Sequence, residues 1–345
     1  MQKYSLFIGI DISKQTFDAC IAWSSQQGSC PHHVFSQDTT GYKKLVRWVN
    51  KIASKNASHL GSCPKTSWFV YAEHTGLYGL RLARFLEQEH IPYLFDSPLR
   101  INRSLGLKRQ KDDQADAQDI ARCAMRRDFS QKVRPIPVKC LVKVHALLSL
   151  RHRLVRYKAG LQVAAKELIF TTEAPVYQAV ENASKAVMDQ ILEQIKFCEK
   201  QIKKLLHADA QLSKLYELVN SVIGIGPIIT AYVIVYTNGF TAFDNPKQFN
   251  CFMGTAPFKY KSGTSINQKD KVNSMANHKL KALFAMAAVS AVQHDPQIRD
   301  FFNRSLERGK EEPWIYNAIK TKLVKRIFAV VRRGTPYVVL DKHLK

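Results

Sequence analysis

Five short stretches in the N-terminal third of the chain are typical of β-strands: "YSLFIGID", "FDACIAW", "HHVFSQ", "SWFVYAEHTG" and "IPYLFDSP". In the first, Leu6, Ile8 and Ile10 alternate with Phe7 and Gly9, the period of two of a strand with apolar residues on both faces. "TGYKKLVRWVNKIA" and "LYGLRLARFLEQEH" precede the fourth and fifth stretches and have the three- and four-residue apolar spacing of helices. Three meandering strands followed by alternating helix and strand predict an α/β domain over residues 1–130, in the element order of the ribonuclease H-like fold.

Residues 131–210 show helical spacing alone. Two long stretches, 138–170 and 180–210, are separated by "TTEAPVYQ", which predicts a long helical hairpin or coiled coil. The second stretch carries an apolar stripe of Ile191, Ile195, Cys198, Ile202 and Leu205. This stripe can join two subunits, or it can pack against the first helix of the same chain, and the spacing allows both.

Residues 211–345 predict a third, mainly helical domain. "LVNSVIGIGPIITAYVIVYTNG" places Gly224 and Gly226 in a tight turn between two apolar helices. In a helix-hairpin-helix, such a turn lets backbone N–H groups approach a phosphate, and a plain turn between helices is the alternative. "ALFAMAAVSAV" is too short to span a bilayer and is typical of a buried helix.

Charge is distributed unevenly along the chain. The 345 residues include 52 Lys+Arg and 28 Asp+Glu, a formal net charge of +24. Residues 99–158 carry 16 basic and 5 acidic side chains, residues 245–345 carry 19 and 7, and residues 159–244 carry 7 and 9. Two basic blocks of this size favour nucleic acid over a membrane as the partner, with Arg151 and Arg153 as candidate contacts. A generally basic, solvated surface is the alternative.

Targeting signals and cysteine motifs are absent from the sequence. It has neither a signal peptide pattern nor an apolar run of membrane-spanning length, so we expect a cytoplasmic protein associated with the nucleoid. The seven cysteines are scattered and form no C-x-x-C pair, which is typical of reduced thiols.

Four carboxylates stand where elements begin or end. Asp11 ends the first expected strand, Glu73 stands near the end of the fourth, and Asp113 and Asp116 lie one turn apart at the start of a helix. If these groups converge, they repel one another unless a cation binds, and oxygen ligands predict Mg²⁺ or Mn²⁺. Such ions polarise phosphodiesters. Taken singly, each acid has an ordinary alternative as a turn residue, a surface charge or a helix N-terminal acid.

Five motifs, in the order "GIDISKQTFD", "AEHTGLYG", "KDDQADA", "GIGP" and "MGTAPFKYKSGTS", resemble the DEDD-type transposases of bridge-RNA-guided insertion sequences, relatives of the Piv site-specific DNA invertases. The resemblance covers nearly the whole chain. It implies a RuvC-like N-terminal domain and a helical C-terminal transposase domain. It assigns the acidic tetrad to Asp11, Glu73, Asp113 and Asp116, and the nucleophile to Ser262. The family usually has Thr at the position of Asp112, which therefore competes with Asp113 as a ligand, and Asp119 competes for the same helix roles.

The expected nucleophile is considered separately, because serine is a weak nucleophile and no His lies near it in the sequence. Lys259 and Lys261 precede Ser262 and Gly263 follows it, which predicts a cationic, flexible loop that can receive a phosphate. Without the resemblance, a phosphate-contacting or solvated serine is the simpler interpretation. Ser265 is the second candidate nucleophile.

The resemblance implies a recombination reaction. DNA strands are cut and joined through a serine-linked phosphate, in a site built from the acids of one subunit and the serine of another. The implied partners are donor and target DNA, a noncoding guide RNA that pairs with both, and further copies of the chain, as a dimer that becomes a tetramer on DNA. A Holliday-junction resolvase-like nuclease with water as nucleophile is the main alternative. An actin-like kinase or ATPase needs later Gly-rich nucleotide loops, and the intact acids disfavour an inactive DNA-binding protein.

Overall fold

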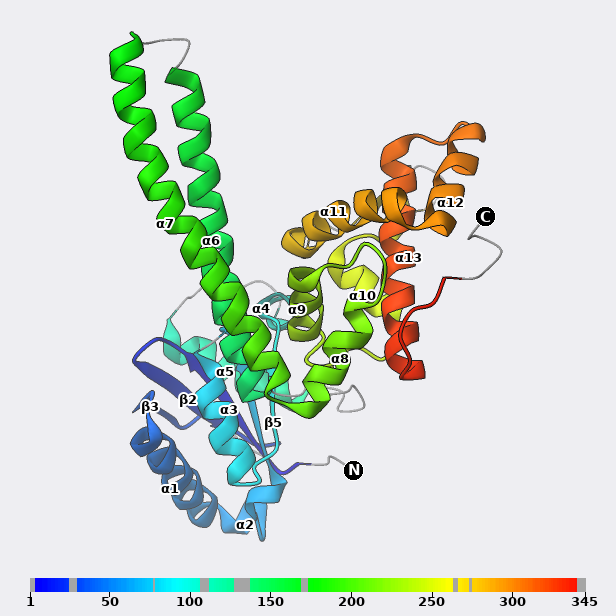
Figure 1. Ribbon diagram of the computed structural model, residues 1–345. Helices are drawn as coiled ribbons and strands as arrows, with labels where there is room; N and C mark the ends of the chain where they lie inside the picture. The colour runs from blue at the N-terminus through cyan, green and yellow to red at the C-terminus, as the bar shows by residue number, and fades with distance from the viewer. Residues whose placement is uncertain are drawn as a thin grey trace. The chain divides into compact units, whose positions relative to one another are not determined.

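A computed structural model describes residues 4–24, 30–76, 78–105, 112–126, 137–168, 173–262, 266–272 and 275–339. The chain forms two compact units, Met1–Ile136 and Pro137–Lys345. In the first unit, five strands form a sheet in the order β3-β2-β1-β4-β5 (Figure 1). The strands are β1 (Leu6–Ile12), β2 (Thr16–Ala22), β3 (His32–Ser36), β4 (Trp68–Glu73) and β5 (Tyr93–Asp96). All five strands expected from the sequence are therefore present.

The sheet is mixed. β1, β2 and β3 are antiparallel neighbours, whereas β4 runs parallel to β1 and β5 runs parallel to β4. Each parallel strand is preceded by a helical segment, as a parallel connection requires. The helices of this unit are α1 (Thr39–Lys55), α2 (Ala57–Leu60), α3 (Gly79–Gln88), α4 (Pro98–Leu105) and α5 (Asp113–Met125), with a 3₁₀ turn at Lys65–Ser67. The sequence patterns did not predict α2 and α4.

The two faces of the sheet have different partners. Leu6, Ile8 and Ile10 of β1 point to one face and form a core with buried residues of α1 and α3. Phe7 points to the other face and packs with Ile120 of α5. Because side chains alternate between the faces of a strand, odd-numbered positions of β1 lie on the α5 side.

Gly9 lets α5 pack closely against β1. A Cβ at this position would lie 2.2 Å from both the Ala117 carbonyl oxygen and the Ala121 backbone nitrogen. No side chain fits in that space, so the glycine sets how near the helix comes to the strand. The close contact holds the first turn of α5 beside the carboxyl end of β1.

The second unit begins with a long helical hairpin of α6 (Lys139–Leu168) and α7 (Ala174–His207), whose helices run side by side (Figure 1). α7 starts earlier than the sequence pattern suggested, because Pro175 occupies its first turn, where proline is tolerated. Ile195 and Ile202 of the expected apolar stripe are buried, and Ile202 packs with Leu141 of α6. This part of the stripe therefore packs within its own chain.

The rest of the second unit is helical except for one β-hairpin. Its helices are α8 (Ala210–Asn220), α9 (Pro227–Tyr236), α10 (Pro246–Met253), α11 (His278–His294), α12 (Pro296–Glu307) and α13 (Glu312–Arg333). β6 (Pro257–Ser262) and β7 (Ile266–Val272) pair as antiparallel strands. The sequence predicted a flexible loop around Ser262. For residues 257–262 this prediction was wrong, because their backbone forms a strand.

α11 buries one face, in line with its apolar sequence, and exposes the other. Phe284 and Ala288 are buried, whereas Met286 is 72% exposed. Among the helices that the structure describes, none has the length and apolar character needed to cross a membrane. All seven cysteines are free thiols, as expected.

Candidate active site

Asp11 and Glu73 lie side by side at the carboxyl ends of two parallel strands. Ile10 of β1 is paired with Ala72 of β4, so the next position in each strand brings Asp11 beside Glu73. Both side chains point to the α5 face. Phe69, Tyr71 and Glu73 stand two residues apart in β4 and so share one face of the sheet, and Phe69 and Tyr71 belong to the core that includes Ile120 of α5. The first two expected site residues are therefore neighbours.

α5 brings the other two acids within electrostatic reach of Asp11. Burial, followed by the negative charges of Asp113 and Asp116, raises the pKa of the Asp11 carboxyl above its ordinary value. A hydrogen bond from the backbone N–H of Ile12 acts in the opposite direction and does not offset the rise. The mutual repulsion shows that the Asp11 carboxyl lies within electrostatic reach of both helix acids.

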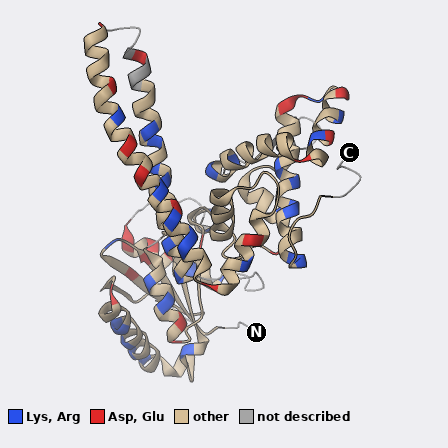
Figure 2. Ribbon diagram, viewed as in Figure 1, with Lys and Arg blue, Asp and Glu red and all other residues tan. Residues whose placement is uncertain are grey.

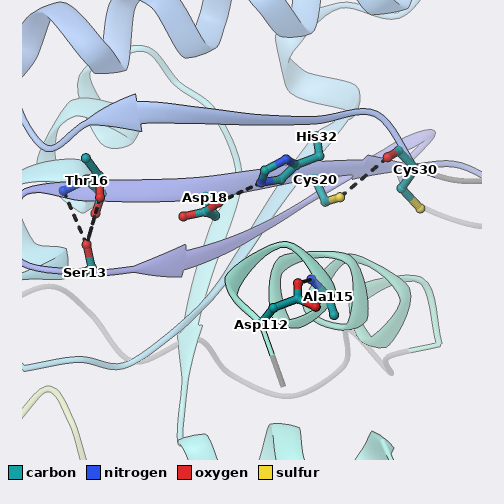
Figure 3. Close-up of polar contacts among 8 residues, drawn as sticks. All are labelled: Ser13, Thr16, Asp18, Cys20, Cys30, His32, Asp112 and Ala115. Carbon is teal, nitrogen blue, oxygen red and sulfur yellow. Dashed lines mark hydrogen bonds and ion pairs between the residues drawn. The ribbon is translucent and has the colours of Figure 1, made fainter. Parts of the chain in front are cut away.

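Asp112 has a different role from its neighbour. It is the N-cap of α5, and its Oδ1 accepts a hydrogen bond of 2.7 Å from the Ala115 backbone N–H (Figure 3). Asp113 and Asp116 are the helix acids whose charges raise the pKa of Asp11 most. The geometry therefore favours Asp113 over Asp112 as the partner of Asp11.

The donors suit a hard divalent cation. Their oxygens come from β1, β4 and the first turn of α5, and carboxylates in such a set are typical Mg²⁺ or Mn²⁺ ligands. Over the ranges that the structure describes, no three His, Cys, Asp or Glu side chains are close enough together to hold a metal ion. The four acids therefore lie on the α5 side of the sheet without forming a closed coordination shell.

Two further carboxylates extend this row across the sheet and were missed from the sequence. Asp18 of β2 is paired with Asp11, and Asp96 of β5 is paired with Glu73. Oδ1 of Asp18 lies 2.7 Å from Nε2 of His32, in the adjacent strand β3 (Figure 3). A signal was present, because "YLFD" ends on an acid just as "LFIGID" does.

Asp96 is well compensated despite being only 8% exposed. The Tyr71 hydroxyl donates a 2.9 Å hydrogen bond to its Oδ2, and the Ser97 backbone N–H donates a 2.8 Å bond to Oδ1. Arg100 lies 3.5 Å away as an ion-pair partner. These contacts hold the end of β5 next to Glu73, which is a structural role for the outer carboxylate of the row.

The expected nucleophile lies in the second unit. Ser262 is the last residue of β6, and its backbone pairs with that of Ile266 in β7. The side chains of Lys259, Lys261 and Ser262 lie outside the described part of the chain, as do Gly263 and Ser265 entirely. What the structure contributes here is the hairpin backbone that carries the serine.

The turn between α8 and α9 has two glycines with different constraints. Gly224 has φ +92°, and a Cβ there would lie 2.7 Å from the Ala287 carbonyl oxygen of α11. A Cβ at Gly226 would meet no atom within 4 Å. Gly224 is therefore required for packing, and only Gly226 faces open space.

The two expected arginine contacts on α6 also differ. Nε of Arg151 lies 2.7 Å from Oε1 of Glu199 on α7, so it joins the two helices of the hairpin. Arg153 is exposed. Figure 2 shows Lys and Arg gathered on the half of the hairpin nearer to α8, with few at its far end.

Comparison with known proteins gives two family matches. The DEDD transposase model of IS110 elements (DEDD_Tnp_IS110) matches residues 8–167, and the model of the transposase IS116/IS110/IS902 family matches residues 216–303. The chain is a DEDD-type DNA transposase or recombinase. The first match spans all four acids of the enzyme, and the second spans the hairpin that carries Ser262.

Individual relatives agree with this assignment. The pilin gene-inverting proteins of Moraxella bovis and Moraxella lacunata are each 25% identical to the enzyme over 340 residues, covering 96% of this chain and 97% of theirs. An uncharacterized 43.6 kDa protein of insertion element IS110 from Streptomyces coelicolor is 28% identical over 145 residues, 42% of this chain and 35% of its own. The expected transposase or recombinase activity on DNA is thereby confirmed.

Proposed function

We propose that the protein is an RNA-guided transposase or site-specific recombinase of an insertion sequence, with a RuvC-like catalytic domain. The observation that carries the proposal is the common face of Asp11, Glu73 and the start of α5, where the charges of Asp113 and Asp116 act on Asp11. In this proposal the four acids hold Mg²⁺ or Mn²⁺. When bound, the metal polarises a DNA phosphodiester and stabilises the attacking and leaving oxygens.

The acids and the serine have separate tasks. Asp11 and Glu73, fixed on adjacent strands, orient the phosphodiester, while Asp113 and Asp116 close the site from the helix. The Ser262 hydroxyl loses its proton and forms a bond to phosphorus, and the departing deoxyribose oxygen takes up a proton. The result is a phosphoserine–DNA ester, which a hydroxyl from another strand can attack in the reverse reaction.

The charge distribution supports nucleic acids as partners. The basic blocks of residues 99–158 and 245–345 suit binding to nucleic acid, and the family resemblance of the sequence implies donor DNA, target DNA and a noncoding guide RNA. Composite sites, with acids and serine from different subunits, require a homo-oligomer, as a dimer or as a tetramer on DNA. Sequencing the RNA that co-purifies with the protein tests the guide. A single abundant noncoding species is expected, and a random mixture of cellular RNA would contradict it.

The decisive experiment separates serine chemistry from water chemistry. Wild-type protein trapped on a nicked suicide substrate should give a covalent adduct whose peptide contains Ser262. Ser262→Ala should remove both the adduct and recombination and retain DNA binding, while Ser265→Ala should be much milder. Cleavage by Ser262→Ala at the wild-type rate, with free phosphate ends, would show instead a resolvase-like nuclease that uses water.

A further inference from the structure

α13 has one exposed side that runs along almost the whole helix. Ile319 and Leu323 lie in the core of the second unit, on the side of α13 that packs against other helices. At about 100° per residue, positions 314, 318, 322, 325, 329 and 332 fall within a sector of about 80° on the opposite side. All of these residues except Ala318 are exposed. This side of α13 is therefore open to a partner.

The exposed side of α13 is basic. It carries Lys322, Lys325 and Arg332, with Ala329 between them, and we call these three cations the basic face. The acidic residue of α13 is Glu312, in the first turn and at the other end of the helix from Arg332. Figure 2 shows Lys and Arg at intervals along α13. The basic face thus has no counter-charge near it within the helix.

Contacts with α12 and with the C-terminal segment hold α13 in place. Nη1 of Arg326 lies 2.5 Å from Oδ2 of Asp295, the buried N-cap of α12. The guanidinium carbon of Arg326 lies 4.8 Å from the ring centroid of Tyr337. Nζ of Lys322 lies 4.2 Å from the ring centroid of Phe301 in α12. The basic face is therefore carried by a fixed element, so less conformational entropy is lost when a ligand binds.

The cations of the basic face have like charges as neighbours. Burial, followed by the positive charges of Arg326 and Lys325, lowers the pKa of Lys322. Over the residues that the structure describes, the carboxylate that forms an ion pair with α13 is Asp295, and its partner is Arg326. A solvated helix face usually carries both signs of charge. A face with one sign only indicates a polyanionic partner.

We propose that Lys322, Lys325 and Arg332 bind phosphates of duplex DNA on the two strands that border its major groove, with α13 lying across the groove. The lysines stand seven and ten residues from Arg332, which is about 10 to 15 Å along a helix, and the major groove is about 12 Å wide. Ala329, between the cations, lets the helix backbone come close to the DNA. The narrow major groove of duplex RNA does not admit a helix. The choice of DNA deepens the proposed function and rests on it.

The first test measures the salt dependence of DNA binding. Lys325→Gln and Arg332→Gln should each weaken binding of a mixed-sequence DNA duplex about tenfold at about 0.1 M salt, as expected for the loss of one charge-assisted contact. The slope of log affinity against log salt should fall by about 1 for each substitution and by about 2 for the double variant. Lys51→Gln removes an exposed cation of α1, outside both basic blocks, and should retain the wild-type slope. Wild-type slopes for both single variants would overturn the proposal.

The second test introduces a negative charge between the cations. Ala329→Glu and Ala329→Gln add side chains of the same size at an exposed position and differ by one charge. Ala329→Glu should bind the DNA duplex about tenfold more weakly than Ala329→Gln, because its carboxylate repels the phosphates. Both variants should have similar Tm values by circular dichroism. Equal affinities for the two variants would show that DNA does not approach this side of α13.

A duplex of RNA with the same sequence distinguishes the two nucleic acids. Lys325→Gln and Arg332→Gln should lower the affinity for the DNA duplex more than the affinity for the RNA duplex, because the RNA groove excludes the helix. An equal or larger loss of affinity for RNA would contradict the assignment of the ligand as DNA.

The outcomes also separate the basic face from the proposed function. Wild-type slopes in variants that still form the Ser262 adduct would overturn the basic face as a DNA contact and leave the function standing. Reduced slopes, for a protein whose wild type forms no Ser262 adduct, would support the basic face and count against the proposed serine chemistry.

Discussion

Asp11 experiences burial and like charge at the same time. Its position at the end of β1 places it opposite Asp18 on one side and next to Glu73 on the other, with Asp113 and Asp116 acting from α5. Burial and the charges of Asp113, Asp116 and Asp18 raise its pKa, so the ionised form is disfavoured in the folded protein relative to the unfolded chain. A site that is suited to a cation is therefore destabilised when no cation is bound.

Replacing the Asp11 carboxylate should raise stability and abolish activity. Because the folded-state pKa of Asp11 is raised, its ionisation lowers stability above that pKa, and the penalty disappears as the pH falls and the group is protonated. Asp11→Asn should thus raise Tm by about 2–4 °C at pH 7 in EDTA, as expected for about 1 kcal/mol in a unit of this size. The difference should shrink at pH 4, and scanning calorimetry at both values measures it.

The same variant should be inactive in metal-dependent strand exchange and retain DNA affinity. Glu73→Ala and Asp116→Ala should behave alike in this respect. Full recombination by wild-type protein in EDTA would show that these acids do not act through a metal. Equal Tm values for Asp11→Asn and the wild type at pH 7 would show that the carboxylates do not repel one another.

At the scale of elements, the distance between β1 and α5 determines how near Asp113 and Asp116 lie to Asp11. Gly9→Ala would place a methyl group 2.2 Å from backbone atoms of Ala117 and Ala121, which a helix can relieve only by moving. We expect a loss of about 2 kcal/mol or more, and a loss of cleavage, because Asp113 and Asp116 would move away from Asp11. Chemical denaturation and a nicking assay measure the two effects.

A second glycine provides the control for this substitution. A Cβ at Gly160, in α6, would meet no atom within 4 Å. Gly160→Ala should leave cleavage unchanged and stabilise the helix by about 0.5–1 kcal/mol. If Gly9→Ala retains wild-type stability and activity, the close approach of α5 to β1 is not required for the site.

The turn between α8 and α9 offers a similar pair. Gly224→Ala combines a left-handed backbone with a 2.7 Å approach to the Ala287 carbonyl oxygen, and should destabilise the second unit by about 2 kcal/mol. Gly226→Ala fills open space and should leave Tm unchanged. If the turn contacts a phosphate as a helix-hairpin-helix does, Gly226→Ala should weaken DNA binding. An unchanged affinity in a binding titration would favour a plain turn between helices.

Local patterns predicted those elements whose order and periodicity are strong. The five strands of the sheet were predicted because each is a short stretch of strand-forming residues bounded by turns or helical segments. The hairpin β6–β7 was missed because its lysines and glycine suggested a cationic loop, although "PFKYKS" has the period of two of a strand. The charged residues indicated a loop and the periodicity indicated a strand, and pairing with β7 makes this segment a strand.

Pairing across elements lies beyond such patterns. Asp18 and Asp96 join the row of acids only through the register between strands, which no single segment encodes. The stripe on α7 is another example. Its spacing predicted an apolar face, but not that Ile195 and Ile202 would pack within the hairpin.

At the scale of the whole molecule, the helical hairpin leaves a second apolar stripe exposed. Val176, Val180 and Val187 lie on one side of α7 at spacings of four and seven residues, and Val176 and Val187 are 52% and 51% exposed. They occupy the far part of the hairpin, where Lys and Arg are few (Figure 2). Exposed apolar stripes of this kind mark protein contacts better than nucleic-acid contacts.

This stripe, and not the buried one, should therefore join subunits. The double variant Val180→Asp, Val187→Asp introduces charge into the exposed seam and should lower the oligomer mass in light scattering, with helical content retained. Ile195→Asp, at a position 7% exposed, should instead destabilise the hairpin itself, which circular dichroism would detect as a lower Tm. If the active site is composite, as proposed, the double variant should also lose recombination while still binding DNA. If its mass equals that of the wild type, subunits meet elsewhere and the far end of the hairpin has another partner.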